Sequence, residues 1–383
     1  MNYRILSVLD LILGNFGLAV LVFFLRRRRN LPEPEKVENI TVLKFLGYGS
    51  LILAAPALYA VKKHYPKAKL ILYTTSDLQQ NAGILKIFDE VILLDPIRPF
   101  YSLRVFFRAK SRFKAEKTLI INLEFFSKTA VFICGFLRGA YTLSLSLKTY
   151  RLLDLCIVPD DKKSSSIAEI YDLIAESLGC RSDSAGYAAL LQSSVGTRQR
   201  RIIIAPFCSN LSLRRMWNPE KWGLFISGFC DKHPEYSVAV IGAPANRLEA
   251  EKIINVSGKA GKVHNFCGEI SFSEAFSLIR SGSCFCGIDS APLHLARLAA
   301  VPSVSLWGAT DPHLLTRDFP GYPEVIIFAR QHCSPCVHTR KKCHLPGGCL
   351  NTVSPDMVID AVSELLKGGV SGRKTVYPEK KRK

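Results

Sequence analysis

Acidic residues are scarce in this 383-residue chain, and several familiar signals are missing from it. Asp and Glu number 32 against 51 Lys and Arg, and the formal net charge of +19 indicates an anionic partner such as a nucleic acid, a membrane surface or a phosphorylated substrate. The sequence has no short-period repeat and no recognisable nucleic-acid-binding motif, and much of its charge lies beside an N-terminal apolar run, on one helix and in the tail. We therefore expect no nucleic-acid partner.

The N-terminal segment lacks the charge order of a cleaved secretion signal. Ile5 to Leu25 contains no Lys or Arg and ends in the cluster Arg26–Arg29, whereas a signal peptide carries its positive charge before the apolar run. A helix of this length rises roughly 30 Å, enough to cross the hydrocarbon core of a bilayer. We expect residues 1–30 to anchor the chain in the inner membrane, with the body on the cytoplasmic face. Asp10 leaves an in-plane or re-entrant helix as the alternative.

Apolar runs alternate with helical patterns from Ile40 onward. The runs that we interpret as buried parallel strands are 40–46, 69–74, 90–94, 118–123 and 141–145, then 201–205, 237–241, 263–266, 283–287, 303–307 and 325–329. The helical patterns are 50–64, 77–87, 99–114, 126–138 and 167–178, then 219–231, 246–257, 272–281, 290–300 and 355–367. This alternation is typical of α/β proteins with doubly wound sheets.

The pattern also divides the chain into segments. After the anchor and a linker at 31–39, we predict an N-terminal Rossmann-like domain at 40–190 and a C-terminal one at 200–368, with a polar linker at 181–200 and a basic tail at 369–383. We expect the tail to be disordered from Gly372 onward. It could touch anionic lipid or be solvated without a specific role.

The stretch from Gly287 to Ala296 is the most informative part of the sequence. It follows the strand at 283–287 and opens a helix, so unpaired amides and the positive end of a helix dipole meet at the carboxyl end of a strand. We interpret this turn as a pocket for a diphosphate sugar. Its candidate residues are Asp289 as a hydroxyl acceptor, Ser290 and the amides of Ala291 and Leu293 as phosphate donors, and His294 as a further donor. The alternative is that Asp289 only caps the helix and His294 is a core residue.

A second loop contributes cations to the same rim. It follows the strand at 201–205 and contains Ser209, a candidate donor-site residue, and Arg215. We expect Arg215 to hold phosphate, because a guanidinium binds phosphate through two parallel hydrogen bonds. Trp217 and Trp222 are predicted to pack at the start of the next helix.

In the first half, the strand at 40–46 runs into Gly47-Tyr48-Gly49-Ser50. Glycines at such a junction allow a ligand to approach closely, although the spacing is neither a dinucleotide fingerprint nor a P-loop. On the helix at 99–114, Arg104, Arg108 and Arg112 form one stripe. This stripe either contacts lipid head groups or an anionic lipid-linked acceptor, or is a solvated face.

Three blocks of sequence, Leu43–Pro66, Ala205–Trp222 and Gly287–Pro312, resemble those of the heptosyltransferases of glycosyltransferase family 9. The resemblance implies a GT-B fold, with two Rossmann-like domains facing a cleft, the acceptor in the N-terminal domain and the nucleotide sugar in the C-terminal one. It implies an inverting transfer from an ADP-heptose-like donor to a lipopolysaccharide core or similar lipid-linked glycan. On that match, the donor-binding positions are Asp289, Ser290, Ala291 and His294, the acceptor-binding residues are Gly47, Tyr48 and Gly49, and Arg215 lies where the family often has a phosphate-contacting lysine.

One departure from the family concerns the catalytic base. Gly49-Ser50 stands where the family usually has Gly-Asp, and a serine hydroxyl is not basic near neutral pH, whereas inverting transfer requires a group that takes a proton. We therefore consider Ser50 together with Glu124, which follows the strand at 118–123 at the carboxyl end of the same sheet. Glu124 could be the base, could hold the acceptor, or could be an exposed glutamate that caps the next helix.

Four of the twelve cysteines are clustered. Cys333, Cys336, Cys343 and Cys349 lie within a short segment with interspersed histidines, and they indicate a structural zinc site. The alternatives are disulfide or redox chemistry, and unligated packing thiols. We expect the remaining cysteines to be buried thiols.

The sequence leaves two candidate functions. The leading one is a membrane-associated glycosyltransferase that needs no cofactor for catalysis, because a helix dipole and cationic side chains balance the leaving diphosphate. The alternative is a non-catalytic nucleotide-sugar or glycan-binding member of the family that has lost its base at Ser50.

Overall fold

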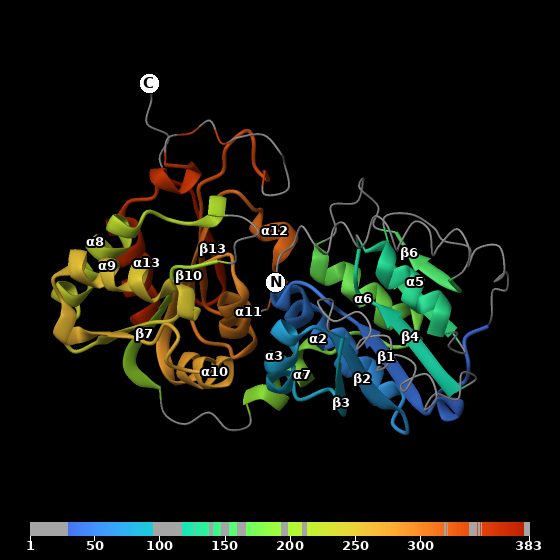
Figure 1. The fold of residues 1–383 in the computed structure, drawn as a ribbon. Helices are drawn as coiled ribbons and strands as arrows, with labels where there is room; N and C mark the ends of the chain where they lie inside the picture. The colour runs from blue at the N-terminus through green and yellow to red at the C-terminus, as the bar shows by residue number, and fades with distance from the viewer. Residues whose placement is uncertain are drawn as a thin grey trace. The chain divides into compact units, whose positions relative to one another are not determined.

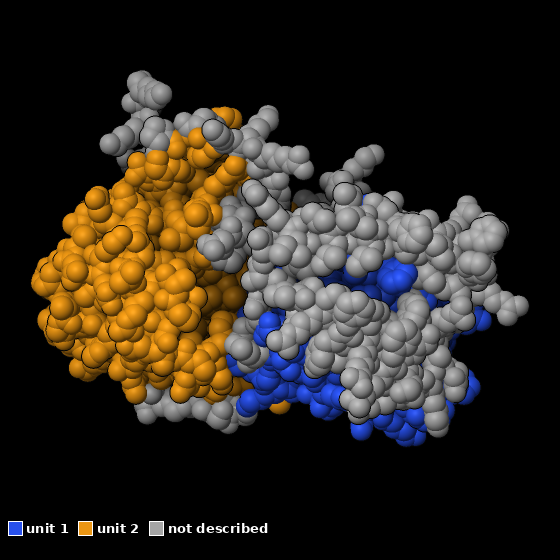
Figure 2. Space-filling view, viewed as in Figure 1, with its two compact units in different colours: residues 1–187 blue, residues 188–383 orange. Residues whose placement is uncertain are grey.

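The computed structural model describes most of the chain after the N-terminal segment. The described residues are 30–94, 117–125, 127–137, 141–146, 153–158, 166–192, 198–208, 213–317, 319, 321–336, 343, 345 and 347–378. The predicted anchor at 1–30 and the arginine stripe at 99–114 therefore lie outside these residues, apart from residue 30. Among the helices that are described, none combines the length and apolar character needed to cross a membrane. The chain divides into two compact units, residues 1–187 and 188–383 (Figure 2).

The first unit is built on a parallel sheet. Its described strands, in the order β3-β2-β1-β4-β5-β6, are β1 (Asn39–Leu43), β2 (Lys69–Thr74), β3 (Glu90–Leu93), β4 (Thr118–Asn122), β5 (Tyr141–Leu145) and β6 (Leu155–Ile157). The described helices of this part are α2 (Tyr48–His64), α3 (Ser76–Ala82), α5 (Lys128–Leu137), α6 (Ile167–Ser177) and α7 (Ser184–Gln192). Helix α2 packs on α6, and α5 packs on β4 and β5.

The second unit repeats the scheme with one strand more. Its described strands, in the order β13-β12-β11-β10-β7-β8-β9, are β7 (Gln199–Ala205), β8 (Ser237–Val240), β9 (Val263–Asn265), β10 (Gly282–Ile288), β11 (Ser303–Trp307), β12 (Glu324–Phe328) and β13 (Arg373–Val376), all parallel. The helices are α8 (Pro219–Lys232), α9 (Arg247–Ser257), α10 (Phe272–Ser281), α11 (Ala291–Leu298), α12 (Pro312–Leu315) and α13 (Pro355–Leu366). Helices α8, α9 and α13 lie on one face of the sheet, and α10 and α11 on the other (Figure 1).

Each sheet has one point at which its strand order reverses. In the first unit the chain moves outward from β1 to β3 and then returns to place β4 on the other side of β1. In the second unit, β7 and β10 stand in the same relation. Ligands of open α/β sheets bind at such switch points, outside the carboxyl ends of the strands, so the loops after β1, β4, β7 and β10 are the places to search for a site.

The sequence explains why these elements form. The central strands are apolar along their length and buried on both faces, as the fully buried residues of β4, β11 and β12 show, which is typical of parallel sheets. Ser166 with Glu169 and Ser271 with Glu274 form capping boxes that begin α6 and α10, and each satisfies amides that the helix leaves unpaired.

The structure confirms the α/β class and the two parallel sheets, and it corrects three local predictions. Residues 184–192 of the predicted linker form α7, and Leu155–Ile157 form an unpredicted strand, β6. The prediction of a disordered tail from Gly372 is wrong for Arg373–Val376, which pair with β12 as strand β13. The reason is that the Arg373 side chain binds the buried Glu324 carboxylate, with Nε 3.1 Å from Oε2. A cleft between the domains stays a prediction.

Candidate active site

At the switch point of the second sheet, Arg215 contacts Asp289. Arg215 follows β7, and Asp289 is the first residue after β10. The Arg215 guanidinium donates from Nη1 to the Asp289 main-chain oxygen at 2.8 Å and lies 3.5 Å from the carboxylate Oδ2. The structure therefore brings together a predicted phosphate-binding cation and a predicted hydroxyl acceptor from segments 74 positions apart.

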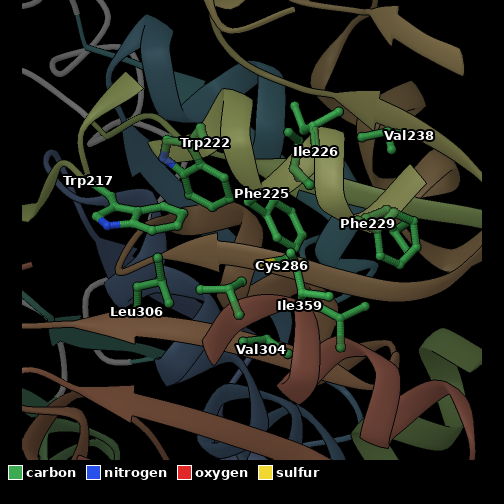
Figure 3. Packing of buried hydrophobic residues seen from close by; sticks show 14 of the residues in the cluster. Trp217, Trp222, Phe225, Ile226, Phe229, Val238, Cys286, Val304, Leu306 and Ile359 are labelled. Atoms are coloured by element: carbon green, nitrogen blue, oxygen red, sulfur yellow. The ribbon is translucent and has the colours of Figure 1, made fainter. Parts of the chain in front are cut away.

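Aromatic packing fixes the segment that carries Arg215. Trp217 and Trp222 are buried with ring centroids 5.0 Å apart and edge to face, as predicted, and they belong to the same buried cluster as Leu306 of β11 (Figure 3). Arg214, the residue before Arg215, donates from its Nη1 to the Cys336 carbonyl at 2.8 Å. Contacts of the neighbouring residues thus hold the backbone at Arg215 in place.

The turn before α11 differs in detail from the prediction. Ser290, not Asp289, occupies the N-cap position, and its Oγ donates to the Ile288 carbonyl at 3.2 Å instead of capping the helix. The Leu293 amide donates to the Ser290 carbonyl at 3.1 Å, so it is already used inside the turn. The Ala291 amide, at the first position of the helix, precedes any intrahelical acceptor. Of the two amides predicted to bind phosphate, Ala291 is therefore the better placed.

His294 lies in the interior of the site. Its side chain is 7% exposed, its Nε2 is 4.0 Å from Asp289 Oδ1, and no described group lies within hydrogen-bond reach of its Nδ1. Burial lowers the pKa of His294 to about 3, and the positive charges of Arg297 and Arg215 act in the same direction. His294 is therefore neutral near pH 7 and offers one donor and one acceptor, but no charge, to a ligand.

Two residues near this rim were not predicted. Cys208, in the loop after β7, lies close enough to Arg215 and Asp289 to interact with both, and burial raises the pKa of its thiol. Thr310 follows β11, the strand next to β10, and its buried Oγ1 has no partner among the described residues. Position after a strand was the available signal in both cases. Ser209, which was predicted to bind the donor, lies outside the described residues.

At the switch point of the first sheet, the predicted acceptor residues form the start of α2. Gly47 has φ +79°, a left-handed conformation that favours glycine, and Ser50 Oγ donates to its carbonyl at 2.7 Å. Tyr48 is half-buried, and burial raises the pKa of its hydroxyl. The Ser50 hydroxyl thus holds the turn at the start of α2. A serine hydroxyl is also not basic near neutral pH, so neither observation favours Ser50 as the catalytic base.

Glu124 follows β4 and reaches back to the loop after β1. Its Oε1 accepts from the Phe45 amide at 2.7 Å and the Leu46 amide at 3.0 Å, and Lys44 Nζ lies 3.3 Å from the same oxygen. Glu124 is 8% exposed, so the interpretation as an exposed helix cap is wrong. Ser127 takes that part, because its Oγ accepts from the Ala130 amide at 3.1 Å.

Sequence reasoning missed Lys44, which is 4% exposed. Burial disfavours its ammonium, but the Glu124 carboxylate outweighs this and holds the pKa of Lys44 above its usual value. The Tyr171 hydroxyl of α6 lies near Lys44, Glu124 and Ser50. A buried ion pair at a sheet's switch point, with perturbed pKa values around it, is a recurring feature of functional sites.

Comparison with known proteins shows a similarity to one family. The sequence model described as "Glycosyltransferase family 9 (heptosyltransferase)" matches residues 164–345, a range that includes Arg215, Asp289 and His294. Lipopolysaccharide heptosyltransferase 3 of Escherichia coli is 23% identical over 298 residues, 70% of this chain and 83% of that protein. Lipooligosaccharide heptosyltransferase 2 of Campylobacter jejuni is 22% identical over 334 residues, 83% of this chain and 95% of that protein. The chain is thus similar to the heptosyltransferases of glycosyltransferase family 9.

Solved structures agree with this similarity at the level of the fold. A family 9 glycosyltransferase from Veillonella parvula is 18% identical with a TM-score of 0.67, and the match covers 88% of this chain and 99% of that one. The E. coli heptosyltransferase WaaC, solved with ADP-2-deoxy-2-fluoro heptose, is 15% identical with a TM-score of 0.64, covering 85% of this chain and 99% of that one. The two parallel sheets thus match those of the GT-B heptosyltransferase structures. The family model and the curated relatives, not the fold, show that the chain is a glycosyltransferase.

In this glycosyltransferase the four clustered cysteines do not form a ligand set among the described residues. Within the part of the chain that the structure describes, no three His, Cys, Asp or Glu side chains are placed to hold a metal ion, and none of these four cysteines is in a disulfide. Cys349 is buried against Gly308, so close that a Cβ added there would lie 2.3 Å from its Sγ, whereas Cys343 is exposed. The predicted zinc site is therefore not supported by the described residues.

Proposed function

We propose that this glycosyltransferase transfers a heptose-like sugar from an ADP-heptose-like nucleotide sugar to a lipopolysaccharide core or another lipid-linked surface glycan. The observation that carries the proposal is the contact of Arg215 with Asp289, beside a neutral His294, at the β7–β10 switch point. The names of the E. coli and C. jejuni relatives, and the ADP-heptose analogue in the WaaC structure, support the choice of sugar and acceptor.

The donor's diphosphate would lie at the start of α11. There the Ala291 amide and the helix dipole favour an anion, and Arg215 adds a full positive charge from the neighbouring strand end. Asp289 would accept from a sugar or ribose hydroxyl, and His294 would donate or accept one hydrogen bond. Positive charge at the leaving diphosphate stabilises the transition state, so we propose that catalysis requires no metal ion.

On the acceptor side, we propose Glu124 as the group that takes the proton of the acceptor hydroxyl. The acceptor oxygen then attacks the anomeric carbon from the face opposite the leaving diphosphate, which inverts the configuration at that carbon. Ser50 would line the acceptor site together with Gly47, Tyr48 and Gly49. The lipid-linked acceptor fits the proposal that residues 1–30 hold the enzyme at the cytoplasmic face of the inner membrane.

Nucleotide-sugar binding tests the donor assignment directly. We expect ADP-heptose to raise the melting temperature of the purified full chain more than ADP-glucose, UDP-glucose or GDP-mannose does, because a ligand that binds the folded state stabilises it. Arg215→Met should weaken ADP-heptose binding by about 10- to 100-fold, since a hydrogen bond to a charged group contributes ~1.5–3 kcal/mol.

The matched control is Lys232→Met, which removes a cation that pairs with Asp360 at 2.8 Å. Lys232 is the last residue of α8, which leads away from the carboxyl ends of the strands. This variant should bind ADP-heptose as the unaltered chain does. Equal weakening in both variants, or no stabilisation by any of the four nucleotide sugars, would refute the donor site.

A second function, binding without catalysis, is favoured by Ser50 in the position where the family usually has an aspartate. It predicts that ADP-heptose binds but is neither transferred nor hydrolysed. Turnover with any lipid-linked acceptor would exclude it.

A further inference from the structure

Lys44 and Glu124 form a buried ion pair at the β1–β4 switch point, with exposures of 4% and 8%. Removing both charges from water is costly, so a buried ion pair is weak evidence for a role in stability. Leu43 and Asn122 are partners in the sheet register, so the pair stands at the ends of two adjacent central strands. The fold itself therefore places it at the edge where a ligand of this sheet binds.

Glu124 is held both at its main-chain amide and at its carboxylate. Its amide donates to the Asn122 side chain at 3.0 Å, and Asn122 in turn donates to Ser144 at 2.9 Å. At the other end, the described contacts of the carboxylate all fall on Oε1, from Lys44 and from the amides of Phe45 and Leu46. A carboxylate fixed through one oxygen keeps the second in a defined place, which is the preorganisation that proton transfer requires.

The groups around Glu124 differ in what they can accept. Among the described neighbours, Lys44 is protonated, because its pKa is held above the usual value. Burial raises the pKa of Tyr171 on α6, so its hydroxyl also keeps its proton. Ser50 on α2 is not basic. Glu124 is thus the one carboxylate in this described group, and Lys44 is the cation paired with it.

We propose that Lys44 is a positioning residue for glycosyl transfer, which fixes Oε1 of Glu124 and leaves Oε2 to receive the acceptor's proton. The proposal rests on the function proposed above. In the step, the acceptor O–H bond breaks and its proton moves to Oε2. The acceptor oxygen forms a bond to the anomeric carbon, and the bond from that carbon to the diphosphate oxygen breaks, so that the nucleoside diphosphate leaves with the electron pair.

The test compares transfer from ADP-heptose to a heptose-deficient lipopolysaccharide core by the full chain and by four variants. Lys44→Met should lower kcat by about 100-fold or more, the range of general-base effects, with KM for ADP-heptose unchanged within about 3-fold because the donor binds on the other sheet. Lys44→Arg, which keeps the charge, should recover most of the rate. Glu124→Gln should lose at least as much as Lys44→Met.

The control is Lys62→Met. Lys62, near the C-terminal end of α2, also pairs with a carboxylate in the first unit, Asp89 at 2.8 Å. Unlike the Lys44–Glu124 pair, this pair is partly exposed. Its loss should change kcat by less than about 2-fold, as expected for a surface pair.

The pH profile separates positioning from a merely structural role. Removing a cation 3.3 Å from Oε1 makes the carboxylate easier to protonate, so Lys44→Met should lose activity on the acid side at a pH about 1 unit higher or more. Glu124→Gln should lose the acid limb altogether. Circular dichroism shows whether Lys44→Met folds. If it does not, the test uses the other two variants: Lys44→Arg must keep the fall of activity at acid pH, and Glu124→Gln must not.

A failure of the positioning proposal can be distinguished from a failure of the proposed function. If the unaltered chain transfers sugar but Lys44→Met behaves like Lys62→Met, or slows without moving the acid limb, the positioning proposal is overturned and the function stands. If the unaltered chain transfers no sugar, the proposed function fails and the proposal fails with it.

Discussion

His294 gives the second unit a stability that depends on pH. Its pKa is lowered to about 3 by burial, whereas a histidine in an unfolded chain titrates near 6.5. Above pH 6.5 neither state is protonated, and His294 adds no pH dependence. As the pH falls below 6.5, the unfolded chain gains a proton that the folded chain cannot hold at this site, so stability declines until the pH approaches 3.

The size of this effect follows from the two pKa values. Between pH 7.5 and pH 5.0, protonation of the unfolded histidine should cost the folded state about 2 kcal/mol. His294→Gln, which keeps polar atoms in the site but cannot titrate, should remove that slope. His264→Gln, at an exposed histidine of β9, is the control and should keep it.

The assay is urea unfolding followed by tryptophan fluorescence at pH 7.5, 6.0 and 5.0. The chain has three tryptophans, and Trp217, Trp222 and Trp307 are all buried in the second unit, so the signal reports on the unit that contains His294. If His294→Gln lost stability between pH 7.5 and pH 5.0 as steeply as the unaltered chain, the neutral, buried His294 described here would be refuted.

Two further predictions concern the support of the site. Glu324→Ala leaves Arg297 and Arg373 without the buried carboxylate that both bind, and it should destabilise the second unit by about 3–5 kcal/mol in the same urea assay; a loss below about 1 kcal/mol would contradict the buried network. Gly287→Ala adds a Cβ at 2.9 Å from a phenylalanine ring and 3.1 Å from a carbonyl of β7, so it should cost about 1–3 kcal/mol. Gly261→Ala, where a Cβ meets nothing within 4 Å, should be close to neutral, and equal costs would argue against the close strand contact.

The sequence was most informative where local patterns and the fold agree. The strand predicted at 283–287 is Gly282–Ile288 and the helix predicted at 290–300 is Ala291–Leu298, because an apolar run followed by a polar turn and a one-sided helix has few other solutions. Packing of Trp217 and Trp222 was predicted correctly for the same reason: large aromatics at the start of an amphipathic helix bury themselves.

Two of the misses share one cause, which is pairing between residues far apart in the chain. Lys44 interrupts an apolar run and carries no local signal of burial; its partner Glu124 comes 80 positions later and was itself compatible with an exposed cap. The basic segment Arg373–Val376 has the composition of a tail, and it becomes a strand because Glu324, 49 positions earlier, holds Arg373. Long-range charge pairing of this kind cannot be derived from periodicity.

Sugar transfer tests the central claim most directly. Purified full-length protein would be incubated with ADP-heptose and a heptose-deficient lipopolysaccharide core, and ADP release and the mass of the acceptor would be followed together. The proposed function predicts that ADP appears in step with an acceptor heavier by one heptose, and that Arg215→Met slows both. Binding of ADP-heptose with neither ADP release nor an acceptor of higher mass would contradict it and favour a non-catalytic binding protein.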